Sequence, residues 1–536
     1  MIVNNPAIQS LTHIWSNFTS SAFFNSGGGV PLGGYYRPLP SFLYTIFWHW
    51  WGAEPTYFRL MQIFLHLIFL ILAFFTIKKL LSLNNIKQSS KIAFISTLLF
   101  AVHPANVETV QYVADLGSIL YPLFALLSFY LLMMAPRPNH KMSIWLLALS
   151  ALSIFIALLA QEGAIVMTVV AALYFVLFLR DRWFYFIHYL VMGLLSYSVY
   201  LFLRLNVANL GYSFQFPTIL AQSGPVGRLL TFPYEAVSYL RLAFFPTRLS
   251  IDNQFAVTSA RDPRFWGSTI ILVLIIGSVY LLIKRQAKWP LYLFLIGWFA
   301  LILGPMLNII PLDLSIAEHW MYLPMVGIIT FVVLLIFENI PRWPKLLQEF
   351  MPHILVIILI LFSVRTMVRN LNWRDGLTLY GHDIQYNLNN SSLENNYGVE
   401  LFRIGKMDEA ANHFQKSVDA NAKWEVSLNN LGVIYERQNN LDKASEYYQQ
   451  SIKAGDYHLA YENMAGILIK QNKFKEAQQF LASALKKYPY NETLQASMAV
   501  AYYNLGDNVN AKNWASAVYA NNPSNQTAVH ILNALQ

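Results

Sequence analysis

The chain has 536 residues, of which 56% are hydrophobic and only 12% are charged. The hydrophobic residues form runs too long for the core of a soluble domain, so the composition predicts a protein that crosses a membrane several times. The net charge of +9 does not indicate nucleic-acid binding, because most of the basic excess lies in short loops between hydrophobic runs. The absence of cysteine excludes disulfides and thiolate metal sites, and no other metal site is predicted.

Residues 1–54 contain no run long enough to span a bilayer, and the aromatic stretch 42–51 is typical of a helix in the membrane interface. Residues 55–370 predict a bundle of ten transmembrane helices, of which the second is short for a crossing. The predicted spans are 56–80, 92–104, 117–134, 143–160, 163–179, 184–203, 266–284, 289–308, 320–338 and 351–368.

Lysine and arginine residues cluster in alternate connections between these spans, and the positive-inside rule places that face in the cytoplasm. The clusters lie at 78–91, 137–141, 180–182, 284–288 and 342–345. The N-terminal segment, the acidic interruptions between spans and everything after residue 370 are then predicted on the opposite face. Because neither a signal peptide nor a span precedes this external N terminus, we expect the complete protein to have a further span upstream of Met1.

A polar stretch at residues 101–118 interrupts the hydrophobic runs. If it is helical, Glu108 and Asp115 are seven residues apart on one face, with Gln111 and Tyr112 between them. Such a face needs water or a ligand rather than lipid.

Further acidic residues are predicted at the same side of the membrane, at Glu162, Asp252 and Glu318. Together with the polar stretch they indicate a cavity, because ionisable groups at span ends are functional more often than structural. Helix capping by Asp115 is the alternative for that residue. His103 stands next to Pro104 and could equally cap or break a helix.

Residues 228–245 read as an amphipathic helix rich in aromatic side chains. Two interpretations remain open for it: a helix lying at the outer membrane interface, or a surface loop packed on the bundle.

The polar C-terminal part, 391–536, carries an internal repeat. Small residues recur at Gly398, Gly432, Ala465 and Ala499, and an alanine follows twelve residues after each. A period of 34 residues is typical of tetratricopeptide repeats, so the sequence predicts four helical hairpins and a capping helix at 527–535. Residues 371–390 are predicted to form a linker helix. Repeats of this kind usually present a groove to a peptide, so protein binding is expected here.

Short motifs, taken in their order along the chain, resemble the transmembrane and TPR repeat-containing O-mannosyltransferase family, in a bacterial type. They are Tyr36-Arg37-Pro38-Leu39, residues 100–104, Glu108-Thr109-Val110, Ala114-Asp115-Leu116, Glu162-Gly163, Asp252, residues 308–311 and residues 317–324. That family is similar to the GT-C glycosyltransferases. The resemblance therefore implies an all-α protein, with a GT-C-like transmembrane bundle followed by a TPR α-solenoid.

The resemblance also implies an activity. A sugar, most simply mannose, would pass from a polyprenyl-phosphate-linked donor, dolichyl or undecaprenyl, to an exported protein held by the repeats. The reaction needs a carboxylate to orient or deprotonate the acceptor hydroxyl, and a cation to neutralise the phosphate. The candidate catalytic residues are Asp115, Glu162 and Glu318, and the candidate donor-binding residues are Arg37, His103 and His319.

Arg37 is the preferred phosphate ligand, because a guanidinium binds phosphate through two hydrogen bonds and stays charged at the interface. The alternative is that Arg37 reaches to lipid headgroups. The resemblance implies a bacterial inner membrane with periplasmic repeats, or an ER membrane with lumenal repeats.

The chain departs from the resembled family at several positions. The family usually has a first span and an acidic pair before an Asn-Pro stretch, whereas here Asn4-Asn5-Pro6 follows only three residues. We therefore expect the catalytic carboxylate of that pair to lie upstream. The family also commonly has basic residues where this chain has Val113, Gln161 and His319. A catalytically inactive, membrane-anchored TPR scaffold is the alternative function.

Overall fold

The computed structural model describes residues 8–9, 11–19, 35–135, 141–208 and 219–536. Its regular secondary structure in these ranges is entirely helical, which confirms the all-α fold class. The chain forms two compact units that divide after Arg374, and each is described by itself. The Asn4-Asn5-Pro6 motif and Arg137 lie outside the described residues.

The first unit contains seven described helices that are long and apolar enough to cross a membrane. They are built on α2 (Pro55–Leu83), α5 (Gly117–Met134), α8 (Trp183–Phe202), α11 (Pro263–Ile283), α12 (Trp289–Leu303), α13 (Pro324–Asn339) and α14 (Lys345–Asn372). Three predicted spans form shorter apolar helices: α3 (Ser89–Ala101), α7 (Val166–Phe178) and the stretch 144–160 of α6 (Lys141–Ala160). All ten predicted spans are thus helical.

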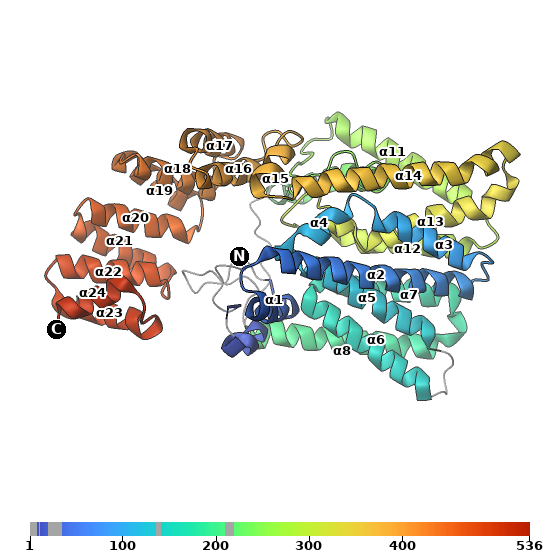
Figure 1. Ribbon diagram of the computed structural model, residues 1–536, viewed down its shortest axis with the longest axis horizontal. Helices are drawn as coiled ribbons and strands as arrows, with labels where there is room; N and C mark the ends of the chain where they lie inside the picture. Colours follow the sequence, from blue (N-terminus) through green and yellow to red (C-terminus); the bar gives the residue numbers. More distant parts are fainter. Residues whose placement is uncertain (1–7, 10, 20–34, 136–140, 209–218) are drawn as a thin grey trace. The chain divides into compact units, whose positions relative to one another are not determined.

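The bundle is held together by large apolar side chains at the helix crossings. Helix α5 packs against α2 and α6, and α12 packs against α7 and α13 (Figure 1). At the centre, the ring of Phe129 lies 5.4 Å from that of Tyr174, 5.7 Å from Phe294 and 5.3 Å from Trp298. Offset and edge-on ring contacts of this kind stabilise a core beyond the area they bury.

The polar stretch 101–118 does not form the single helix that we considered. Helix α4 (Asn106–Gln111) ends at Tyr112, whose φ of −78° and ψ of 87° leave the helical region, and a short turn η2 (Val113–Asp115) follows. The interpretation of Glu108 and Asp115 as members of one helix face is therefore wrong. The break redirects the chain before α5 begins.

Helix α10 (Gly224–Phe244) corresponds to the predicted amphipathic helix and packs on the bundle through a polar face. On that face, the hydroxyl of Thr231 accepts a hydrogen bond from the backbone of Val257 at 2.9 Å. Two turns further on, the hydroxyl of Tyr239 accepts from the backbone of Ala317 at 3.3 Å. The helix therefore holds two of the loops at this end of the bundle.

A third contact of α10 fixes the turn that follows α12. Asn308 has a φ of 48°, a left-handed conformation that asparagine tolerates better than most residues. Its amide donates to the carboxylate of the buried Glu235 at 2.8 Å and to the carbonyl of Leu314 at 3.1 Å. Burial raises the pKa of Glu235 to about 8. Glu235 and Asn308 therefore shape the loop that leads to residue 317.

The second unit is built from helical hairpins (Figure 1). After α15 (Gly376–Asp383), the pairs are α16 (Ser391–Arg403) with α17 (Met407–Ala420), α18 (Glu425–Arg437) with α19 (Leu441–Ala454), α20 (His458–Lys470) with α21 (Phe474–Lys487), and α22 (Glu492–Asn504) with α23 (Asn508–Asn521). Helix α24 (Gln526–Ala534) follows as the predicted cap.

The small residues of the repeat stand where the two helices of a hairpin approach most closely. A Cβ atom on Gly398 would lie 2.7 Å from the ring of Phe414. A Cβ atom on Gly432 would come still closer to the ring of Tyr448. The recurring small residue is therefore required by helix packing, as the repeat pattern predicts.

Residues 375–536 should fold without the membrane unit, because their apolar clusters are made within and between neighbouring hairpins. Circular dichroism of this fragment should show a helical spectrum with a cooperative melt. Gly432→Val should lower its stability by about 1–3 kcal/mol through overpacking against Tyr448. A disordered spectrum for the unmodified fragment would contradict the repeat assignment.

Candidate active site

Four of the six predicted site residues lie together at one end of the membrane unit, on short segments that join its helices. Asp115 ends the turn η2, and Glu162 begins the turn η3 (Glu162–Ile165). The two turns come close because Gly117 starts α5, where a Cβ atom would meet the carbonyl oxygen of Ala160 at 2.9 Å. The missing side chain lets the ends of α5 and α6 approach.

Arg37 lies between these two carboxylates. Its NH1 is 3.5 Å from Oδ1 of Asp115, and its Nε is 3.9 Å from Oε2 of Glu162. The side chain is only 17% exposed, and its guanidinium lies over the ring of Tyr35 at 4.9 Å. Burial alone would lower the pKa of Arg37, but the carboxylates of Glu162 and Asp115 raise it above its ordinary value. Arg37 is thus held by the protein rather than directed to headgroups.

His319, at the start of η7 (His319–Met321), is bound by Glu108. The ring Nδ1 lies 2.8 Å from Oε1 of Glu108, and the backbone N–H donates to Oε2 at 3.1 Å. Its Nε2 lies 3.8 Å from Oδ2 of Asp115. Burial opposes the charge, but Glu108 and then Asp115 raise the pKa of His319 to about 9. At neutral pH the ring is therefore an imidazolium.

We call Arg37, Glu108, Asp115, Glu162 and His319 the polar cluster. Asp115 joins its two cations and also accepts a hydrogen bond from Ser118. Glu162 is the most exposed carboxylate of the cluster, at 31%, and its Oε2 has no hydrogen-bond partner among the described residues. The Nε of Arg37 is in the same condition. The cluster thus combines two cations with a partly exposed carboxylate, and the Nε of Arg37 and the Oε2 of Glu162 lie 3.9 Å apart, beyond hydrogen-bond distance.

Glu318, a predicted catalytic residue, is 1% exposed and directs Oε1 toward Arg369, with 3.3 Å between Oε1 and NH2. This position favours a role in holding the chain next to His319 over contact with a substrate. Asp252 is also buried, and Gln254 donates to its carboxylate at 3.5 Å.

His103, predicted to bind the donor, does not contribute to the polar cluster. Its Nδ1 accepts from the backbone N–H of Ala105 at 3.2 Å, and its Nε2 lies 3.1 Å from the carbonyl oxygen of Ala243, to which it donates. Burial lowers the pKa of His103 to about 4. His103 is therefore a neutral histidine that joins the turn after α3 to α10. This is a structural role rather than binding of the donor.

Neither the ion pair of Arg369 with Glu318 nor the hydrogen bond of Asn308 to Glu235 was predicted from the sequence. One signal was present for Arg369, since an arginine at the non-cytoplasmic end of a predicted span runs against the positive-inside rule. No sequence signal pointed to Glu235, because its partner Asn308 lies 73 residues away.

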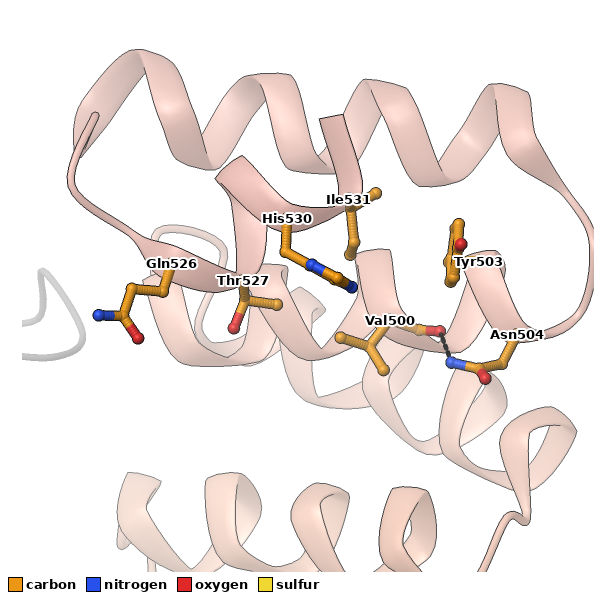
Figure 2. A pocket seen from close by; sticks show the side chains of 7 residues that line it. All are labelled: Val500, Tyr503, Asn504, Gln526, Thr527, His530 and Ile531. Carbon is orange, nitrogen blue, oxygen red and sulfur yellow. Dashed lines mark hydrogen bonds between the residues drawn. The ribbon is translucent and has the colours of Figure 1, made fainter. Parts of the chain in front are cut away.

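A hollow of about 630 Å³ lies in the repeat unit, between α22 and α24. Figure 2 shows that Tyr503, Asn504 and His530 line it, together with Gln526. The amide of Asn504 donates to the backbone carbonyl of Val500 at 2.9 Å (Figure 2). Aromatic, imidazole and amide groups could bind a peptide, but the hollow contains no acid paired with a base.

Fold and cluster together define a multi-pass helical membrane protein with a tetratricopeptide repeat domain. Two tetratricopeptide repeat family models match it, at residues 426–454 and 468–535. The chain is 24% identical over 452 residues to the protein O-mannosyl-transferase Tmtc3 of Drosophila melanogaster, covering 72% of this chain. It is also 24% identical over 415 residues to the human protein O-mannosyl-transferase TMTC3, covering 71% of this chain.

These similarities confirm the resemblance to the transmembrane and TPR repeat-containing O-mannosyltransferase family. The chain spans about half the length of these relatives, 48% of the Drosophila protein and 44% of the human one. Among solved structures, the TPR protein YrrB aligns with 29% of this chain at 15% identity and a TM-score of 0.27.

The raised pKa of His319 predicts a pH-dependent stability. Because the pKa is about 9 in the folded protein and about 6.5 when unfolded, the stabilisation is fully present below pH 6.5 and is lost as the pH rises through 9. The loss should be on the order of 3 kcal/mol. Melting curves in detergent between pH 6 and 10 should show it for the unmodified chain, and His319→Gln should abolish it.

His530→Gln, in the repeat unit, is the matched control and should keep the pH dependence of the unmodified chain. Parallel profiles for the unmodified chain and His319→Gln would show that His319 is not held as a cation.

Proposed function

We propose that the chain is a GT-C-like membrane glycosyltransferase. It transfers a sugar, most simply mannose, from a polyprenyl-phosphate donor to an exported protein, which the repeats hold. The observation that supports this proposal is the pairing of two partly buried cations, Arg37 and His319, with carboxylates at the ends of membrane helices. Relatives named protein O-mannosyl-transferases agree with this activity.

In this proposal, Arg37 and His319 receive the phosphate of the donor. The bond between the anomeric carbon and the phosphate oxygen breaks with its electron pair on the phosphate, so negative charge develops there. A guanidinium and an imidazolium, preorganised in a site of low dielectric, stabilise that charge without reorganising during the reaction.

Glu162 is the best-placed general base among the described residues. The oxygen of the acceptor hydroxyl forms the new bond to the anomeric carbon, and its proton passes to a carboxylate. Asp115 already contacts Arg37, His319 and Ser118, so it orients these groups. The side chain of Glu162 is 31% exposed, against 15% for Asp115, so it is the more accessible of the two carboxylates.

The site is proposed to face away from the cytoplasm, in the bacterial periplasm or the ER lumen. The lysine and arginine clusters of alternate loops mark the opposite face as cytoplasmic. A lipid-linked donor is the substrate class suited to that side of the membrane, and an exported protein is the corresponding acceptor.

Arg37→Ala should lower sugar transfer by on the order of a hundredfold or more, because it removes a preorganised charge from the phosphate. The measurement is transfer of radiolabelled mannose from polyprenyl-phosphate mannose to a protein acceptor, with the chain in nanodiscs. Arg37→Lys should fall in between, since a lysine keeps the charge and loses the planar fork.

Arg264→Ala is the matched control, because Arg264 pairs with Asp262 and donates to the carbonyl of Ala256 at the exposed start of α11, and neither contact involves the polar cluster. It should transfer at the rate of the unmodified chain. Equal rates for Arg37→Ala and the unmodified chain would refute the assignment of the phosphate site. No transfer by the unmodified protein, assayed together with any upstream segment, would favour the scaffold instead.

A further inference from the structure

The ion pair between Glu318 and Arg369 is buried more completely than any pair in the polar cluster. Both side chains are at most 2% exposed, and Oε1 of Glu318 lies 3.3 Å from NH2 of Arg369. Each charge alone would be costly in such surroundings, so the two depend on each other. Their pairing joins two segments 51 residues apart in the chain.

Glu318 directly precedes His319, the residue that Glu108 holds by both its ring and its backbone N–H. The carbonyl of Glu318 also accepts the first hydrogen bond of η7, from the backbone of Met321 at 3.0 Å. Any movement of Glu318 therefore moves the backbone of His319. Glu108 thus binds the segment 317–319 through His319, and Arg369 binds the same segment through Glu318.

The polar contacts that place Arg369 next to Glu318 lie at the C-terminal end of helix α14. None of the residues in its most apolar stretch is buried among the described residues. Its last two turns, in contrast, make specific polar contacts. The hydroxyl of Thr366 donates to the carbonyl of Val102 at 2.7 Å, and Arg59 donates to the carbonyl of Trp373 at 3.1 Å.

Trp373 completes this attachment from the other side. The guanidinium of Arg369 lies 5.8 Å from the centre of its indole ring, and the ring of Tyr112 lies 5.7 Å from it. Tyr112 is the residue at which α4 breaks before Asp115. The end of α14 therefore contacts both segments that supply the polar cluster with His319 and Asp115.

We propose that Arg369 is a positioning residue: through Glu318 it fixes the backbone of residues 317–319 and so holds His319 against Glu108. Its effect on sugar transfer rests on the proposed function, whereas its effect on His319 does not. The proposal also reassigns Glu318, which acts through Arg369 and His319 rather than on the substrate.

The test measures the reactivity of His319 in the full chain in nanodiscs. Diethyl pyrocarbonate modifies histidine rings, and mass spectrometry of peptides reports each histidine separately. The double variant Glu318→Gln/Arg369→Gln removes both charges of this ion pair at once, so it avoids burying either charge without the other. We expect His319 to be modified several-fold faster in this variant, with His66 and His103 unchanged.

Arg369→Lys retains a cation with a different reach and should give an intermediate rate. Thr366→Val removes one hydrogen bond of the same helix end and leaves the ion pair, so it should accelerate the modification of His319 much less than the double variant does. A His319 rate unchanged in the double variant would overturn the proposal. So would equal acceleration of His66, His103 and His319, because that result would indicate general loosening of the fold.

Transfer assays provide a second, separable result. If the chain transfers sugar, the double variant should lower kcat several-fold and leave the KM for the donor unchanged, with partial rescue in Arg369→Lys. If the unmodified chain transfers nothing, the proposed function fails, and the labelling of His319 still decides whether Arg369 positions it. A double variant with unchanged kcat and faster labelling would overturn the role in transfer alone.

Discussion

The paired charges at one end of the membrane unit are the constraint on which the site depends. A charge beside a membrane core is costly, and the protein compensates each cation with a carboxylate from a different segment. Arg37 directly precedes α1 (Pro38–Trp51) and meets carboxylates that flank the ends of α5 and α6. His319 follows α12 in the chain and meets Glu108 of α4. These pairs therefore fix the side chains of segments that the apolar packing of the helices brings together.

Two helices that do not contribute to the polar cluster hold the surrounding loops. Helix α10 supplies Thr231, Glu235 and Tyr239 at successive turns, each of which binds a different loop segment. Helix α14 supplies Arg369, which holds the residue beside His319. The polar cluster therefore rests on a supporting layer of buried polar contacts. Such preorganisation is what electrostatic stabilisation of a leaving phosphate requires.

The sequence predicted features that are local or periodic. The small residues at Gly398 and Gly432 recur because each hairpin needs the same close approach, so their spacing reveals the repeat directly. Asp115 and Glu162 were proposed because ionisable groups at span ends stand out against hydrophobic runs, whereas Arg37 and His319 were proposed from the family resemblance. The break at Tyr112 and the partners of Glu235 and Arg369 were not found, since these depend on residues 51 to 73 positions away or on tertiary packing.

The central claim is that Arg37 and His319 together receive the phosphate of a lipid-linked sugar. The most direct measurement is a cryo-EM structure of the chain in nanodiscs with a polyprenyl-phosphonate mannose analogue that cannot be cleaved. The account predicts phosphonate oxygens within hydrogen-bond distance of the Arg37 guanidinium and the His319 ring, with the sugar facing Glu162. A phosphonate bound elsewhere, with Arg37 and His319 still paired only to their carboxylates, would contradict it.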